Sequence, residues 1–196
     1  INRVIDVVFG ALAQAVPDLA PAAPFGTTGV TTISGTREDG TYFVGVYPYP
    51  GGYGGSAGSD GLLNGTLPSS LAGFMSVEQS EVRYPIRFRE LAVREGSAGA
   101  GLHPGGCGTQ YEIEALASCT VSVLGDRVDH APFGVNGGSD AQPNHVHFIL
   151  GGEKWVPPMR SKAEKVQLRT GDRIICQSPG GGGFGDPRLR PAADVE

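Results

Sequence analysis

Residues 178–187 read SPGGGGFGDP and lie close to the C-terminal end of the chain. The four consecutive glycines have no Cβ atoms, so another backbone or a ligand can approach them closely, and positive φ angles are accessible to them. Their consecutive amides can also form an anion-binding nest. Pro179, Phe184 and Pro187 restrict or anchor both ends of the run, which therefore predicts a defined loop rather than a flexible linker.

Glycine is abundant well beyond this run. The 196 residues include 32 glycines and 15 prolines, and 39% of the chain is hydrophobic. The glycines cluster without a collagen-like period. This composition indicates a folded domain in which short strands are joined by tight turns and glycine-lined loops. The first residue is Ile rather than Met, and we expect further chain upstream of it.

Charge and hydropathy argue against two classes of partner. The net charge is −5, and no run of Lys or Arg supplies a basic footprint, so we expect no nucleic-acid binding. No stretch approaches the roughly 18 apolar residues of a membrane span, so we expect no membrane partner.

The three cysteines, Cys107, Cys119 and Cys176, are widely spaced and predict neither a disulfide framework nor a zinc motif. A reduced, cytoplasmic location is the expectation for such a chain.

One segment, at the N-terminus, has a convincing helical pattern. The apolar residues that recur at spacings of four and three are Ile1, Ile5, Val8, Leu12 and Ala15. Such spacing places them on one face of an amphipathic helix. Pro17 is expected to end this helix.

The rest of the chain shows strand patterns. Apolar residues alternate or cluster in TYFVGVY (41–47), VRYPIRF (82–88), YEIEA (111–115), HVHFIL (145–150), KVQLR (165–169) and RIICQ (173–177). The phase shifts after Glu90, which predicts a bulge. Residues 118–128, SCTVSVLGDRV, are expected to be the hairpin partner of 111–115.

Strands this short and closely spaced predict an α+β, mainly β fold. We expect an antiparallel, sandwich-like module with one N-terminal amphipathic helix and glycine-rich loops. We expect the chain to divide into three parts. Residues 1–40 are the helix and connecting segment of an upstream domain. Residues 41–190 form the β-rich module, and residues 191–196 form a tail.

His145 and His147 stand at positions i and i+2 of a predicted strand, so both imidazoles point to one face. That geometry suits two ligands of a metal site, as in a cupin, and Glu153 follows the pair. A cupin-like metalloprotein is one alternative. Half-buried structural positions in a sheet are the commoner role of such a histidine pair.

Four segments, in order, resemble the C-terminal half of hydantoinase B/oxoprolinase proteins. They are residues 51–61 (GGYGGSAGSDG), 76–108, 129–138 (DHAPFGVNGG) and 168–187 (LRTGDRIICQSPGGGGFGDP). The chain departs from the family pattern at Gly96, where an Asp is common, and at Pro104, which replaces a basic residue. It therefore resembles a divergent member.

The resemblance implies part of an ATP-dependent enzyme that hydrolyses cyclic amides of the hydantoin, lactam or oxoproline type, or of a related ketone carboxylase. A hydantoinase A-like subunit is the implied partner, with ATP and Mg bound there. The N-terminal half of the hydantoinase B-like subunit is the second partner and would hold a divalent metal. The third implied partner is a small-molecule substrate. This chain alone is expected to bind no cofactor.

The sequence does not identify catalytic residues. The candidates for the wall of a substrate site or for a subunit contact are Gly51, Gly52, Asp60, Gly180, Gly181, Gly182 and Gly183. The alternative is that the module is a non-catalytic assembly element of the complex, with all chemistry supplied by its partners.

Overall fold

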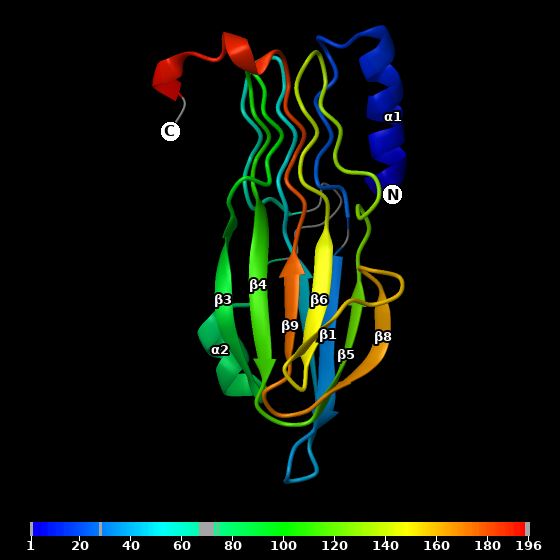
Figure 1. The fold of residues 1–196 in the computed structure, drawn as a ribbon, viewed down its shortest axis with the longest axis vertical. Helices are drawn as coiled ribbons and strands as arrows, with labels where there is room; N and C mark the ends of the chain where they lie inside the picture. Colours follow the sequence, from blue (N-terminus) through cyan, green and yellow to red (C-terminus); the bar gives the residue numbers. More distant parts are fainter. Residues whose placement is uncertain (1, 28, 67–72, 74, 195–196) are drawn as a thin grey trace.

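The computed structural model describes residues 2–27, 29–66, 73 and 75–194, and it consists of a two-sheet sandwich, a bundle of extended segments and two short helices (Figure 1). The helices are α1 (Asn2–Ala15) and α2 (Val77–Arg83), with 3-10 turns η1 (Pro187–Leu189) and η2 (Ala192–Asp194) near the C-terminus. The strands are β1 (Gly29–Thr36), β2 (Tyr42–Tyr49), β3 (Ile86–Arg94), β4 (Gly108–Ala115), β5 (Cys119–Leu124), β6 (His145–Leu150), β7 (Glu153–Trp155), β8 (Ala163–Leu168) and β9 (Arg173–Gln177).

The strands form two antiparallel sheets with the orders β2-β1-β5-β8 and β3-β4-β9-β6-β7. Apolar side chains from both sheets meet in one core, which includes Ile33, Tyr47, Val121, Tyr111, Phe148 and Ile174. Such a core between two sheet faces makes each strand alternate between buried and exposed residues. The predicted mainly β, sandwich-like fold is therefore confirmed, and so is the bulge, which lies between Phe88 and Glu90 in the pairing of β3 with β4.

Two local predictions were wrong. Residues 111–115 and 118–128 do not form a hairpin, because β4 pairs with β3 and β9 whereas β5 pairs with β1 and β8. The chain crosses from one sheet to the other between them, and alternation alone cannot distinguish such an arch from a hairpin. Val82 belongs to helix α2 rather than to a strand, so a second helix replaces the start of the predicted strand. Ser76 caps this helix, because its side chain accepts a hydrogen bond from the Gln79 amide at 3.3 Å.

Beyond the sheets, glycine-rich segments continue along the strand direction and pack side by side (Figure 1). The central one is the run at residues 180–183. The amides of Gly181, Gly182 and Gly183 donate to the carbonyls of Gly106, Ala23 and Ser139, each at 2.9 Å. The run therefore hydrogen-bonds to three different segments through its amides alone.

The surroundings of the run repeat every three residues. A Cβ on Gly180 would lie 2.1 Å from the Ser97 carbonyl oxygen, and one on Gly183 would lie 2.0 Å from that of Ala100. Between them, Gly181 and Gly182 face the Tyr53 and Phe133 carbonyls at 1.9 and 2.0 Å. The predicted defined loop is thus a buried segment within a bundle, and close approach is what requires glycine in it.

Helix α1 lies along the outside of this bundle (Figure 1). Its inward face carries the buried polar residues Asn2 and Asp6, together with Gly10 and Ala13. Its apolar face points outward, and the members of this stripe are Val4, Val7, Val8, Ala11, Leu12 and Ala15. The predicted amphipathic helix exists, but it turns its apolar side away from the described part of the module. Ile1 lies outside the described residues.

The segment 1–40 also supplies β1, which pairs with β2 and β5 in the four-stranded sheet. No helix among the described residues is long and apolar enough to span a membrane. The assignment of α1 to an upstream domain, and of residues 191–196 to a tail, remains a prediction.

Candidate functional site

The structure separates the predicted site residues into two groups. Gly51 and Gly52 are buried in the bundle, where a Cβ on Gly52 would lie 1.8 Å from the Gly106 carbonyl oxygen. Glycines 180–183 are buried there too. A role of these glycines in a substrate site or subunit contact remains a prediction. Their described neighbours are backbone and side-chain atoms of this chain.

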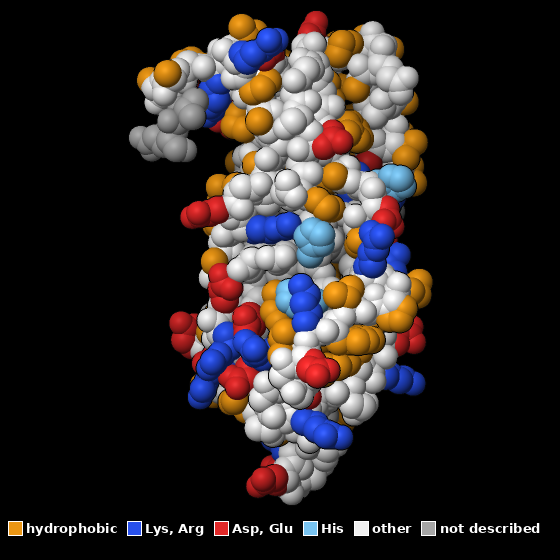
Figure 2. Space-filling view, viewed as in Figure 1, with side chains coloured by type: hydrophobic (Ala, Val, Ile, Leu, Met, Phe, Trp, Pro, Cys, Tyr) orange, Lys and Arg blue, Asp and Glu red, His pale blue; other side chains and the backbone are white. Residues whose placement is uncertain are grey.

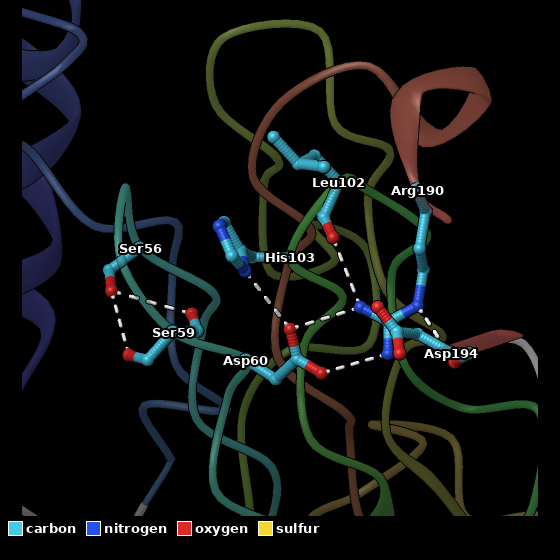
Figure 3. Close-up of polar contacts among 7 residues, drawn as sticks. All are labelled: Ser56, Ser59, Asp60, Leu102, His103, Arg190 and Asp194. Atoms are coloured by element: carbon cyan, nitrogen blue, oxygen red, sulfur yellow. Dashed lines mark hydrogen bonds and ion pairs between the residues drawn. The ribbon is translucent and has the colours of Figure 1, made fainter. Parts of the chain in front are cut away.

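Asp60 instead lies at the end of the bundle farthest from the sheets, in a polar cluster shown in Figure 3. The turn that precedes it is closed by the Ser56 amide, which donates to the Ser59 carbonyl, and by a 2.9 Å contact between the two hydroxyls. Asp60 then accepts hydrogen bonds from both terminal nitrogens of Arg190, at 3.1 and 3.0 Å. This bidentate pairing fixes the plane of the carboxylate.

His103 is the third member of the cluster. Its Nδ1 lies 3.2 Å from Oδ1 of Asp60, the oxygen that also accepts a hydrogen bond from Nη1 of Arg190. The His103 backbone exchanges two hydrogen bonds with Phe184, which immediately follows the glycine run. An imidazole held by a carboxylate through one nitrogen can exchange a proton at its other nitrogen. The pair could therefore act as a general acid or base if a substrate reached it.

Electrostatics favour the ionised form of Asp60. Hydrogen bonding from Arg190 lowers the pKa of this carboxyl group most strongly, and His103 lowers it further. Arg190 also donates to the carbonyls of Leu102 and Asp194, which ties the C-terminal 3-10 turns to the bundle. The cluster thus connects segments 130 residues apart in the sequence.

Asp60→Asn is expected to loosen the C-terminal segment with little change in global stability. The amide keeps the shape of the side chain but loses the charge that pairs with Arg190, and an exposed ion pair contributes about 1 kcal/mol or less. Trypsin should cleave after Arg188 several-fold faster than in the wild-type protein, as followed by mass spectrometry. Glu164→Gln, at an exposed carboxylate of β8, is the control. Equal cleavage rates in Asp60→Asn and the wild type would show that the cluster does not hold this segment.

Within the described residues, no group of three or more His, Cys, Asp and Glu side chains is placed to hold a metal ion. His145 and His147 do point to one face of β6, as predicted, because Val146 and Phe148 between and beside them are buried. The metal site of the cupin-like alternative is thus not assembled in this part of the chain. Sequence reasoning selected Asp60 but not Arg190 or His103, since nothing local links these three positions.

The family model for hydantoinase B/oxoprolinase matches residues 1–187. The B-type subunit of a putative D-/L-hydantoinase of Pseudomonas sp. (strain NS671) is 30% identical over 195 residues, which cover 99% of this chain and 32% of that protein. The crystal structure of the ATP-dependent caprolactamase from Pseudomonas jessenii aligns with a TM-score of 0.80 at 25% identity, covering 94% of this chain and 33% of that one. A nucleotide-free acetone carboxylase shares the fold, with a TM-score of 0.71 at 18% identity over 94% of this chain and 29% of that one.

These similarities agree with the four sequence segments and with the sandwich and bundle described above. The chain spans about a third of the length of the relatives that it matches over nearly all of its residues. It is similar to the ATP-dependent caprolactamase of Pseudomonas jessenii, and it shares its fold with the acetone carboxylase. Since the family model covers 187 of its 196 residues, this chain belongs to the hydantoinase B/oxoprolinase family.

Proposed function

We propose that the chain is the β-rich C-terminal module of a hydantoinase B-like subunit in an ATP-dependent enzyme that hydrolyses a cyclic amide. In this enzyme the module is a rigid scaffold, and its main contact with the rest of the subunit is the outward face of α1. Cyclic-amide hydrolysis is preferred over ketone carboxylation because the putative hydantoinase and the caprolactamase are the relatives with higher identity. The proposed location is the cytoplasm, in keeping with three free cysteines.

The observation that carries the proposal is the inverted polarity of α1. Val7 is 71% exposed and Val4 is 66% exposed, while Asp6 on the opposite face is 5% exposed. Full burial of an aliphatic side chain contributes about 1.5 to 3 kcal/mol. A stripe of such side chains, free of charge, is therefore a surface that favours contact with another apolar surface.

A groove runs beside the same helix. A cavity of about 700 Å³ lies between α1 and residues 133–136, lined by Val7, Ala11, Phe133 and Val135 among others. It gives a covering segment room to pack against the flank of the helix as well as its outer face. The relatives are about three times as long as this chain, so the occupant we propose is the remaining part of a hydantoinase B-like subunit.

The cofactors follow from the same proposal. ATP and Mg would bind to a hydantoinase A-like partner, and a divalent metal would bind to the N-terminal half of the hydantoinase B-like subunit. Phosphorylation of an amide oxygen turns a poor electrophile into a good one, which is the chemical reason for spending ATP on ring opening.

The test is a double variant, Val7→Glu with Leu12→Glu, made in the full-length subunit and purified with its hydantoinase A-like partner. Two buried charges at this contact should separate the module from the rest of the subunit, because an unpaired charge is expensive to bury. We expect faster proteolysis near the start of α1 and at least about a tenfold loss of ATP-dependent hydrolysis of hydantoin, 5-oxoproline or caprolactam.

The matched control is Val82→Glu with Leu189→Glu, which adds the same charges at exposed apolar positions away from α1. Normal proteolysis and turnover in the α1 variant would refute the proposed contact. Absence of ATP-dependent ring opening in the wild-type complex, with the contact intact, would refute the reaction class alone.

A further inference from the structure

A cavity with several charged and polar side chains in its wall lies on the outer face of the five-stranded sheet. It encloses about 470 Å³, and its lining includes His145, His147, Lys154, Arg160 and Gln177. Figure 2 shows histidine side chains bordered by Lys and Arg side chains over the middle of this face. The strand register accounts for the arrangement: Lys154 pairs with Ile149, two residues beyond His147, so all three side chains share the outer face of β6 and β7.

The cavity has an excess of positive charge. Arg160 is paired with Asp129, whose carboxylate accepts from its guanidinium. No carboxylate among the described residues lies within ion-pair distance of Lys154, which leaves one ammonium group uncompensated beside the two rings.

The surroundings of both imidazoles favour their uncharged form. Burial lowers the pKa of each ring most strongly, and neighbouring positive charges lower it further. The charged groups that face the rings are Arg94, Lys154, Arg160 and, with the opposite sign, Glu112. A dianion in the cavity would reverse this balance, since each ring could then take up a proton and donate a hydrogen bond to it.

We propose that this cavity binds a small tetrahedral oxyanion, of the phosphate or sulfate type, between Lys154, Arg160 and the imidazoles of His145 and His147. Two imidazoles beside two cationic side chains form a poor site for a divalent cation, whereas the same set suits an anion. Binding is coupled to proton uptake, so affinity increases as the pH falls from about 8 to about 6. The inference does not depend on the reaction that the whole enzyme catalyses.

The experiment measures the rate at which diethyl pyrocarbonate modifies each histidine in the full-length subunit, by mass spectrometry, as sulfate replaces chloride at constant ionic strength. Sulfate is used because it remains a dianion throughout this pH range. We expect saturable protection of His145 and His147 and none of the exposed His130. The apparent Kd for sulfate should be several-fold lower near pH 6 than near pH 8.

Lys154→Ala should weaken sulfate binding about tenfold, equivalent to about 1.4 kcal/mol. Lys165→Ala is the matched control, because Lys165 is an exposed lysine of β8 in the other sheet. Inorganic phosphate and acetate are then compared with sulfate, and acetate should protect poorly. Equal protection of His130, equal effects of the two lysine variants, or protection by Zn²⁺ but not by sulfate would each overturn the proposal.

Discussion

Gly181→Ala is expected to lower the free energy of unfolding of the module by about 4 kcal/mol or more, or to prevent folding. A Cβ at this position would lie 1.9 Å from the Tyr53 carbonyl oxygen and 2.1 Å from the carbonyl carbon. Both atoms belong to backbone, so no side chain can rotate away to make room. The central segment would have to separate from its neighbours.

The consequence extends beyond one contact because the segment is hydrogen-bonded on all sides. The Gly181 amide donates to Gly106, and its carbonyl accepts from Gly99, each at 2.9 Å. Moving the segment far enough to clear a methyl group would stretch both bonds. A buried amide or carbonyl that loses its partner costs about 1 to 3 kcal/mol. Steric overlap and unsatisfied groups therefore add at the same place.

Gly58→Ala is the matched control for this substitution. Gly58 is exposed, a methyl group added to it would meet no atom within 4 Å, and its φ is not positive. Alanine there should leave stability unchanged or raise it slightly, since it restricts the unfolded chain. Urea unfolding of both variants in the full-length subunit gives the comparison. A Gly181→Ala variant as stable as Gly58→Ala would show that the bundle is not tightly packed.

The glycine run illustrates how far the sequence could be interpreted. Four glycines between anchoring residues indicated close approach of a backbone or a ligand, and the structure contains close backbone approach. The identity of that backbone was not predictable, because the neighbours are Ser97, Tyr53 and Phe133, which come from three separate parts of the chain. No local pattern encodes such pairings, whereas the alternation that predicts a strand is local.

Other differences have the same origin. The spacing of apolar residues predicted the helix α1. Which face of this helix is buried depends on its surroundings, and here the ion pair of Asp6 with Arg127 fixes the inward face. In the candidate site, the exposed Asp60 could be singled out in a glycine-rich turn. Its partner Arg190 lies 130 residues away, in a segment with no recognisable signal.

Arg127→Met is expected to lower the free energy of unfolding by about 3 to 5 kcal/mol and to release α1 from the bundle. The Arg127 Nη2 donates to the Asp6 carboxylate at 2.7 Å, and the two residues are only 8% and 5% exposed. The same guanidinium donates to the carbonyls of Pro24, Phe25 and Ala131. Methionine keeps an unbranched apolar stem but removes every one of these bonds, so a buried carboxylate remains with Arg3 alone.

The pKa values of Asp6 and Arg127 make the stability loss of this variant depend on pH. Burial raises the pKa of Asp6, and Arg127 partly offsets the increase. Burial lowers the pKa of Arg127 to about 10, so the guanidinium stays protonated at neutral pH. Without Arg127, the pKa of Asp6 rises further. A carboxyl group whose pKa is raised in the folded state stabilises the fold below its unfolded pKa and loses that contribution as the pH rises through the folded pKa. The stability deficit of Arg127→Met should therefore shrink as the pH falls from about 7 toward about 4.

Unfolding curves across this pH range, with amide hydrogen exchange of α1, test the prediction. Arg87→Met is the control, because Arg87 is an exposed arginine of β3 and its loss should change stability by less than about 0.5 kcal/mol. Asp6→Asn in the Arg127→Met background should recover part of the loss at neutral pH, since it removes the uncompensated charge. A deficit that is independent of pH, or one that Asp6→Asn does not relieve, would show that something other than the buried carboxylate destabilises the variant. In that case α1 would be held by its small apolar contacts with the bundle rather than by the ion pair.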